Sequence, residues 1–427
     1  MNVLLLGSGG REHAFALSIS KSAKLTKLYI NPGNPGTELL GENVKPTLKS
    51  FREIKDFCLE KDVDMIVVGP EAPLVNGIYN EFITDPDTAH ISVIGPSKEG
   101  AELEGSKDFA KEFMKRHDIP TAGYETIRKE SLYKGFQYID SMKPPYVLKA
   151  DGLAAGKGVL ILDNPDDAKR ELASMLGDNK FGEAGNKVVI EQFMRGIECS
   201  VFVLTDGNSY KILPNAKDYK RIGEGDTGLN TGGMGAVSPV PFVDDAFMEK
   251  VERLIVVPTV EGLKKENIIY KGFIYVGLMN IGGEPFVVEY NCRMGDPETE
   301  VVMPRIKNDI LDLFLAVAEE RLAHTQVDTD PRTAVTVVVA AGGYPEEYVS
   351  GFGIQGLNDV TESTVYHAGT KKDSSRTVTS GGRVLAVTSL GKDIHEAREK
   401  SYRSIAKLRF EGMYFRNDIG LDLLNNK

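Results

Sequence analysis

Residues 148–159, LKADGLAAGKGV, join an apolar run to a glycine-rich loop. Lys149 ends the apolar run, and Gly152, Gly156 and Gly158 follow it. A lysine on a strand supplies a point charge, and glycines let backbone N–H groups approach an anion closely. The Walker pattern GxxxxGK[ST] is absent from this segment. We therefore expect a phosphate-binding loop of another kind, with a flexible turn between strands as the alternative.

The composition is typical of a soluble globular protein with several domains. The chain has 427 residues, of which 41% are hydrophobic and 26% are charged. No segment approaches the roughly 18 uncharged apolar residues of a membrane span. The net charge of -11 argues against nucleic-acid binding. We expect small substrates, no nucleic-acid partner and no membrane contact.

The cysteines and the N-terminal residues favour the cytoplasm. Cys58, Cys199 and Cys292 are too few and too scattered for a disulfide framework or a zinc site. The opening residues MNVLLLGSGG contain neither a basic region nor a cleavage site, so we expect no targeting peptide.

The first hundred residues alternate short apolar runs with helical patterns. This rhythm predicts a doubly wound parallel sheet in an α/β protein. The loops at the carboxyl ends of such strands line one crevice, where open sheets bind ligands. The runs cover residues 3–6, 28–30, 65–68 and 91–94, and each ends in a turn rich in glycine.

The rest of the chain divides into two further units. We predict an N-terminal Rossmann-like domain over 1–104, a larger central domain over 105–331 and a C-terminal, strand-rich α+β domain over 332–427. Within the central domain, residues 121–190 alternate strands and helices around Lys149 and resemble a small lid.

A second anion site is expected where the first strand ends. Residues 7–14, GSGGREHA, should open a helix whose free N–H groups face outward, with Arg11 beside them. A nicotinamide site is the alternative, but GxGxxG fails because Glu12 takes the last glycine position. Residues 31–40 contain Pro32 and Pro35 among glycines and indicate a rigid substrate loop, or else a plain surface turn.

Residues 191–198, EQFMRGIE, follow an apolar run and fit an adenine site. Backbone groups of such a strand exit can bind the base, Phe193 and Met194 can cover it, and Glu198 can reach ribose hydroxyls. Ordinary core packing is the alternative for Phe193 and Met194.

Residues 286–293, FVVEYNCR, predict a metal-binding strand. Positions two apart share a face, so Glu289 and Asn291 should project together, while Phe286, Val288 and Tyr290 pack on the other side. A carboxylate and an amide oxygen suit Mg²⁺, with Mn²⁺ as an alternative ion. Arg293 should lie on the same face and clamp a carboxylate or phosphoryl group. A surface salt-bridge cluster is the alternative.

Residues 226–236, DTGLNTGGMGA, form a second glycine-dense loop. Such a loop can bind an anion through its backbone, and Asp218 just before it is the natural partner for a substrate ammonium. A mobile hairpin is the alternative.

Taken together, these motifs resemble the ATP-grasp superfamily and, within it, the phosphoribosylamine-glycine ligase family. The resemblance extends from residue 1 to about residue 424 and is carried by eight blocks in the family's order. They are GSGGREHA, NPGNPGT, GPEAPL, LEGSKDFAK, LKADGLAAGKGV, NTGGMGAVSP, EYNCRMGDPE and GGRV.

The resemblance implies a reaction and a set of site residues. ATP, glycine and 5-phosphoribosylamine would give ADP, phosphate and glycinamide ribonucleotide through glycyl phosphate, in purine biosynthesis. Arg293, Asp218 and Lys149 would be catalytic, and Glu289 and Asn291 would bind magnesium. ATP would be held by Lys107, Lys149, Gly156, Glu191, Phe193, Met194 and Glu198. The substrates would contact Gly9, Gly10, Arg11, Glu12, Asn34, Pro35, Gly36, Gly69, Pro70, Glu71, Asp218, Arg221, Asn230, Thr231 and Gly232.

The chain departs from the family pattern at a few positions. Residues 216–221 read AKDYKR where relatives read AQDHKR, Leu229 replaces a proline and Met294 replaces a phenylalanine. Residues 273–280 contain no carboxylate, so a second magnesium would need phosphates, water or Asp218. We expect a monofunctional monomer or weak homodimer with a transient contact to the upstream amidotransferase.

Three other functions are compatible with parts of the sequence. They are an ATP-grasp ligase for another carboxylate or bicarbonate, a nicotinamide dehydrogenase built on the first sheet, and a non-catalytic nucleotide-binding regulator.

Overall fold

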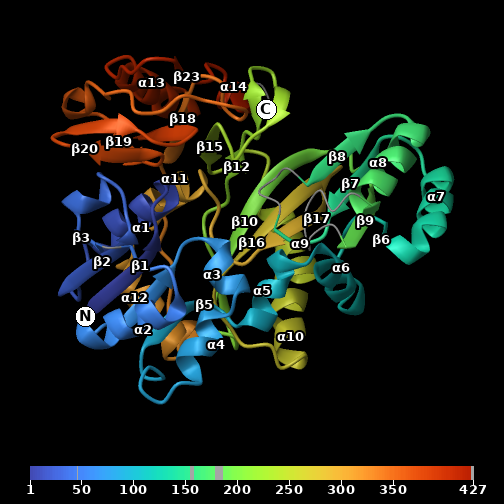
Figure 1. Cartoon of the computed structure of the whole chain (residues 1–427), viewed down its shortest axis with the longest axis horizontal. Coiled ribbons are helices and arrows are strands. Elements are labelled where there is room, and N and C mark those ends of the chain that lie inside the picture. Colours follow the sequence, from blue (N-terminus) through green and yellow to red (C-terminus); the bar gives the residue numbers. More distant parts are fainter. Residues whose placement is uncertain (46, 154–157, 178–185, 425–427) are drawn as a thin grey trace.

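The N-terminal part of the computed structural model is a parallel sheet (Figure 1, blue). The structure describes residues 1–45, 47–153, 158–177 and 186–424. The sheet order is β3-β2-β1-β4-β5, and every neighbouring pair is parallel. The strands are β1 (Asn2–Gly7), β2 (Lys27–Pro32), β3 (Glu42–Asn43), β4 (Met65–Val68) and β5 (Ser92–Pro96).

Helices cover both faces of this sheet, which confirms the doubly wound prediction. On one face Leu5 packs with Phe15 of α1 (Gly10–Ile19) and Phe314 of α12 (Ile310–Ala318). On the other face Leu4 packs with Ile54 of α2 (Phe51–Glu60) and with α4 (Ile78–Ile83). Because α12 lies near the end of the predicted central domain, the chain returns to its first sheet before entering the C-terminal region.

The parallel sheet continues into the central domain through one antiparallel contact. Strand β16 (Tyr270–Ile281) pairs with β5, with Tyr270 opposite Pro96 and Lys271 opposite Gly95. The result is one nine-stranded sheet. Its central part also contains β10 (Ile197–Thr205), β11 (Tyr210–Ile212) and β17 (Glu284–Asn291), supported by α9 (Asp245–Val251) and α10 (Val257–Lys265).

The lid subdomain projects from this body and has a core of its own (Figure 1, right). Helices α5 (Lys98–Gly105) and α6 (Lys107–Arg116) lead to it. Its sheet order is β6-β9-β7-β8, and its apolar core includes Ile127, Leu148 and Leu172. The elements are β6 (Tyr124–Arg128), α7 (Leu132–Ser141), β7 (Tyr146–Ala150), β8 (Val159–Leu162), α8 (Pro165–Gly177) and β9 (Lys187–Gln192).

The C-terminal sheet has the order β12-β15-β18-β22-β19, with β23 beside β18. Its first two strands come from the central segment, so the boundary at residue 331 remains a prediction. The sheet and its surroundings comprise β12 (Lys217–Asp218), β13 (Arg221–Gly223), β14 (Thr227–Asn230), β15 (Gly235–Ser238), β18 (Thr333–Ala341), β19 (Thr364–His367), β20 (Thr370–Asp373), β21 (Arg376–Thr379), β22 (Arg383–Gly391), α13 (Ile394–Ile405), β23 (Met413–Tyr414) and α14 (Leu421–Leu424).

Two short helices complete the body at the crevice, α3 (Glu71–Val75) and α11 (Thr299–Val302). Within the described ranges, no helix has both the length and the apolar character that crossing a bilayer requires.

A histidine pair joins the N-terminal and C-terminal sheets. The backbone N–H of His367 on β19 donates to Nδ1 of His13 on α1 at 2.8 Å. Burial lowers the pKa of His13 to about 3, with His367 adding to the effect, and lowers the pKa of His367 to about 4. Both rings are therefore neutral in the folded protein at neutral pH.

This pair predicts a loss of stability in mild acid. The unfolded chain binds protons at these histidines near pH 6.5, whereas the folded chain does not, so the free energy of unfolding should fall as pH drops from 6.5 to 4. His13→Asn keeps an acceptor for the His367 N–H but cannot titrate, so urea melts should show a shallower pH slope. The exposed His395→Asn variant is the control, and an unchanged slope in His13→Asn would contradict the assignment.

Candidate active site

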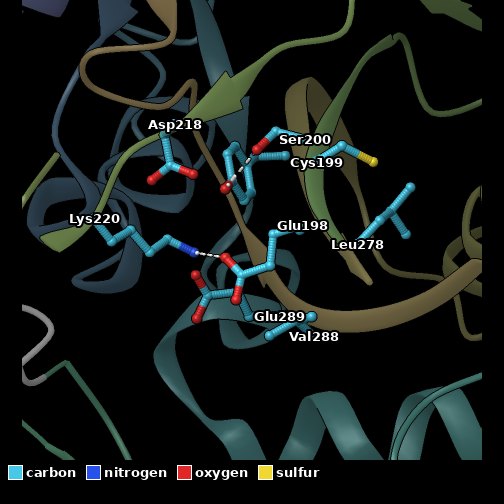
Figure 2. A pocket seen from close by; sticks show the side chains of 10 residues that line it. Glu198, Cys199, Ser200, Asp218, Lys220, Leu278, Val288 and Glu289 are labelled. Atoms are coloured by element: carbon cyan, nitrogen blue, oxygen red, sulfur yellow. Dashed lines mark hydrogen bonds and ion pairs between the residues drawn. The ribbon is translucent and has the colours of Figure 1, made fainter. Parts of the chain in front are cut away.

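A polar pocket lies where the central strands meet β12 (Figure 2). The carboxylates of Glu198 and Glu289 point toward the Lys220 ammonium, and Asp218 lies on the adjoining side. Glu198 comes from β10, Glu289 from β17 and Asp218 from β12. The pocket is lined by Glu198, Cys199, Ser200, Asp218, Lys220, Tyr275, Gly277, Leu278, Val288 and Glu289.

Strand β17 carries the predicted metal ligands, but its alternation is interrupted. The pairing with β16 shifts between Gly277, opposite Glu289, and Leu278, opposite Val287. This bulge places Val287 in the core and turns Val288 to the pocket beside Glu289. The expectation that Val288 packs away from the site was therefore wrong, whereas Tyr290 is buried as predicted.

Glu104 of α5 organises the end of β17 and was not found from the sequence. Nδ2 of Asn291 donates to Glu104 Oε1 at 3.1 Å in the amide orientation that satisfies its hydrogen bonds. Nη2 of Arg293 donates to the same oxygen at 2.8 Å, and the Cys292 N–H donates to Oε2. Holding the amide by its nitrogen leaves the oxygen of Asn291 for a cation.

Arg293 lies beyond β17 and bridges two carboxylates. Its Nε is 3.3 Å from Glu71 Oε2, in addition to its bond with Glu104. Burial disfavours its charge, but Glu104 and Glu71 outweigh that effect and raise the pKa of Arg293. The guanidinium therefore joins the predicted metal strand to Glu71 at the carboxyl end of β4. Asn291 and Arg293 thus meet at Glu104, whereas the pairing of Arg293 with Glu71 was not predicted from the sequence.

The predicted nucleotide lysine belongs to a buried network of three charges. Lys149 Nζ is 3.0 Å from Glu191 Oε1, and Lys111 Nζ is 3.1 Å from Oε2 of the same carboxylate. Although burial disfavours its charge, Lys149 and Lys111 hold the pKa of Glu191 below its ordinary value. Burial lowers the pKa of Lys111 to about 8. Glu191 thus orients two lysines rather than presenting a free carboxylate.

Lys111 could have been inferred from its spacing. It lies one helical turn after Lys107 on α6, so the two side chains share a face. Its Nζ also donates to Thr121 Oγ1 at 2.8 Å, and Thr121 donates to Val287 O at 2.7 Å. Lys111 therefore connects the entry to the lid with the metal strand.

The other predicted nucleotide residues in the described ranges lie at the two connections between the lid sheet and the central domain, Lys107 at the start of α6 and Phe193 and Met194 between β9 and β10. Lys107 Nζ donates to Gly152 O at 2.8 Å, and the left-handed φ of 100° at Gly152 favours glycine there. Phe193 is 36% exposed and Met194 is partly exposed, so core packing is not their role. Gly156 falls outside the described residues.

The charged side chains in and behind the pocket shift one another's pKa values. Lys220 Nζ is 3.0 Å from Glu198 Oε2 and holds the pKa of that carboxyl below its ordinary value. Burial raises the pKa of Asp218 despite Lys220. Burial together with Asp218 raises the pKa of Glu298, behind Ser200, to about 7. A cation bound near Asp218 would stabilise the charged forms of these buried carboxylates.

The predicted substrate loops converge at the carboxyl ends of the parallel strands. A side chain at Gly69 would collide with Glu12, and Asn34 Nδ2 donates to Ser8 O at 2.8 Å. Pro35 and Gly36 continue from Asn34, and Pro70 precedes Glu71. The loops after β1, β2 and β4 therefore lie together at one edge of the sheet, as predicted from the parallel strands.

The start of α1 differs from the expectation of outward-facing N–H groups beside a free arginine. Glu12 accepts the Gly9 N–H at 2.6 Å and pairs with Arg11 Nε at 2.6 Å. The backbone N–H of Arg11, one residue after Gly10, donates to Asp296 at 3.4 Å. This helix start is thus capped by the protein's own carboxylates, and Arg11 is buried.

The second glycine loop connects the pocket with the loops after β1, β2 and β4. Residues 221–230 form the β13–β14 hairpin, in which Arg221 donates to Gly228 O rather than to the pocket, and Asn230 is exposed. Thr231 donates to Lys220 O at 2.8 Å, and Gly232 accepts from Arg383 at 2.7 Å. Arg383, within the GGRV block, also pairs with Asp296, a contact that spacing could not reveal.

The donor set fits a hard divalent cation bound together with a nucleotide. Across the described part of the chain, no group of three or more His, Cys, Asp or Glu side chains could hold a metal ion. Glu289 and Asn291 would supply two oxygen donors, so the remaining ligands would come from phosphates and water.

Three family matches together span most of the chain. They are the N domain of phosphoribosylglycinamide synthetase at residues 1–104, its ATP-grasp (A) domain at residues 105–299 and its C domain at residues 334–422.

Full-length relatives agree with these matches. A phosphoribosylamine-glycine ligase from Chlorobaculum tepidum is 45% identical over 99% of this chain and 100% of its own length. The crystal structure of the Thermotoga maritima phosphoribosylamine-glycine ligase has a TM-score of 0.85 at 36% identity, covering 98% of this chain and 100% of that one. A biotin carboxylase domain from Hydrogenobacter thermophilus shares the fold, with a TM-score of 0.74 at 17% identity over 97% of this chain and 91% of that one. The chain therefore belongs to the phosphoribosylglycinamide synthetase family of ATP-grasp ligases, whose members include the phosphoribosylamine-glycine ligases.

Proposed function

We propose that this chain joins glycine to 5-phosphoribosylamine at the expense of ATP, giving glycinamide ribonucleotide, ADP and phosphate. The observation that carries the proposal is that Arg293 connects two parts of the molecule. It contacts Glu104 beside β17, the proposed metal-binding strand, and Glu71 in the loop after β4. One site suits a nucleotide with its cation, and the other suits a phosphorylated sugar. Full-length identity to phosphoribosylamine-glycine ligases supports the same assignment.

The nucleotide is proposed to bind between the lid and the central sheet. Lys107 and Lys149 would neutralise phosphate oxygens, and Phe193 with Met194 would cover the adenine. Glu191 would act through Lys149, while Glu198 would lie on the ribose side. The biotin carboxylase domain that shares this fold was solved with MgADP, which supports nucleotide binding in general.

Glu289 and Asn291 are proposed to hold Mg²⁺, with Mn²⁺ as a substitute. The ion would neutralise charge on the phosphate oxygens. The chain itself contributes positioned cations and needs no protein nucleophile, because phosphoryl transfer depends mainly on positioning and charge stabilisation. Glycyl phosphate would form when the glycine carboxylate attacks the γ-phosphate, and the amine of phosphoribosylamine would then displace phosphate.

Asp218 is proposed to bind the glycine ammonium, with residues 230–232 beside it. Burial raises the pKa of Asp218, and a bound ammonium would favour its charged form. Phosphoribosylamine is proposed to lie in the crevice formed by Gly9–Glu12, Asn34–Gly36 and Gly69–Glu71. Since Arg221 contacts Gly228 O, it would support the loop rather than touch the substrate.

We further propose a cytoplasmic monomer or weak homodimer that receives unstable phosphoribosylamine through a transient contact with the upstream amidotransferase. Sedimentation with and without that enzyme would test both points.

ADP release with each substrate omitted in turn tests the function. We expect release that requires glycine and MgATP and increases with phosphoribosylamine. Release with bicarbonate in place of glycine would indicate a different ATP-grasp ligase, and nucleotide binding without release would indicate a regulator. Failure to bind MgADP, with nicotinamide binding instead, would favour a dehydrogenase.

Glu289→Gln should impair phosphoryl transfer more than nucleotide binding, because the carboxylate is proposed as a metal ligand. We expect the turnover number to fall roughly 10²-fold while the KM for ATP changes little. Assays at limiting Mg²⁺ measure both. Glu284→Gln, at the exposed start of the same strand, is the control. Near-normal turnover of Glu289→Gln would remove the metal role.

Arg293→Lys should lower turnover by roughly 10²-fold and leave ATP affinity nearly intact. Lysine keeps the charge but lacks the planar fork that reaches both Glu104 and Glu71. Steady-state kinetics and MgADP calorimetry separate the two effects. Normal turnover with weakened nucleotide binding would make Arg293 a ground-state phosphate clamp instead.

A further inference from the structure

The segment around β12 presents its side chains to two different neighbours. Asp218 and Lys220 line the pocket, whereas Lys217 and Tyr219 contact α14 near the end of the described chain. Successive side chains of an extended segment point to opposite sides. Contacts that fix Lys217 and Tyr219 therefore also fix the orientation of Asp218 and Lys220.

Asp422 of α14 contacts both residues that face away from the pocket, Lys217 and Tyr219. Tyr219 Oη donates to Asp422 Oδ1 at 2.6 Å, and Lys217 Nζ is 2.9 Å from Oδ2. Tyr219 Oη also accepts the Gly420 N–H at 3.0 Å. The Lys217 ammonium lies 3.8 Å from the centre of the Tyr219 ring, so the two side chains also stabilise each other. Only 2% of Tyr219 is exposed, whereas the Asp422 side chain is 46% exposed, so these contacts join a buried side chain to a carboxylate at the surface.

Arg416 and Asp418 fasten the hairpin that follows. Arg416 is 1% exposed and donates from Nη1 to Asp226 Oδ1 at 2.8 Å and to Arg221 O at 3.0 Å. Asp418 accepts from Arg416 and, at 2.7 Å, from the Gly225 N–H. The Arg416 guanidinium also lies 5.3 Å from the Tyr219 ring centre, which joins both sets of contacts.

We propose that residues 416–422, here named the C-terminal clasp, position Asp218 and Lys220 for the amino-acid substrate. The clasp touches no pocket residue in these contacts, so its members are positioning residues. The proposal rests on the proposed function in one respect, the assignment of glycine to Asp218. A disturbed clasp should weaken binding of the amino acid more than binding of the nucleotide, because this segment reaches the proposed nucleotide residues only through the Lys220 pair with Glu198.

Tyr219→Phe and Asp422→Asn test the clasp with little change in shape. Losing a hydrogen bond to a charged group should raise the KM for glycine roughly tenfold. The KM for ATP should stay within about twofold, and amide hydrogen exchange should increase over residues 217–236 but not in the lid. Thr388→Val is the matched control, because it removes a buried hydrogen bond of the C-terminal sheet, to Thr336, that involves no residue of the clasp.

Unchanged glycine KM and unchanged exchange in both variants would overturn the proposal. Equal rises in the KM values for glycine and ATP, or the same pattern in Thr388→Val, would also overturn it and indicate a general loss of stability. If the wild-type protein released no ADP with glycine, the proposed function would be wrong, and the exchange comparison, which needs no reaction, would still decide whether the clasp holds residues 217–236.

Discussion

A single buried carboxylate, Glu191, sits between two lysines that come from different parts of the molecule. Burying a charged group is costly unless opposite charges and hydrogen bonds compensate for it. Lys149 belongs to the lid sheet and Lys111 to α6, and Lys111 also reaches Thr121 where the chain enters the lid. The lid, its entry and the metal strand are therefore tied to one another through this group. Two cations against one anion also leave positive charge that suits a polyphosphate.

The second constraint is the short contact between β5 and β16. This contact merges a parallel sheet with an antiparallel one. The parallel sheet provides the loops after β1, β2 and β4, and the antiparallel sheet provides β17, the strand predicted to bind metal. Gly272 approaches Gly95 so closely that a Cβ on Gly272 would lie 3.0 Å from the Gly95 nitrogen. Arg293 then spans the remaining distance between the two sites through Glu104 and Glu71. Two proposed ligand sites on one framework would allow an activated carboxylate to meet its acceptor without leaving the protein.

Local sequence patterns predicted much of this arrangement, for physical reasons that can be named. Alternating apolar runs and turns indicated the doubly wound sheet, and the spacing of Glu289 and Asn291 indicated a shared strand face. The bulge after Gly277 was not predictable, because it depends on the partner strand, and it reversed the orientation expected for Val288. Lys111 and Glu104 were missed because their partners, Glu191 and Arg293, are distant in sequence. The capping of α1 by Glu12 and Asp296 was missed for the same reason.

Calorimetry of MgADP binding to Lys111→Met and Lys111→Arg most directly tests whether the network around Glu191 organises the nucleotide site. Methionine fills the space but leaves Glu191 with one cation, so Lys149 should be drawn away from the phosphates. We expect Lys111→Met to bind MgADP at least roughly tenfold more weakly and Lys111→Arg to retain most of the affinity. Wild-type affinity in Lys111→Met, with the protein still folded, would contradict the central role assigned to this buried carboxylate.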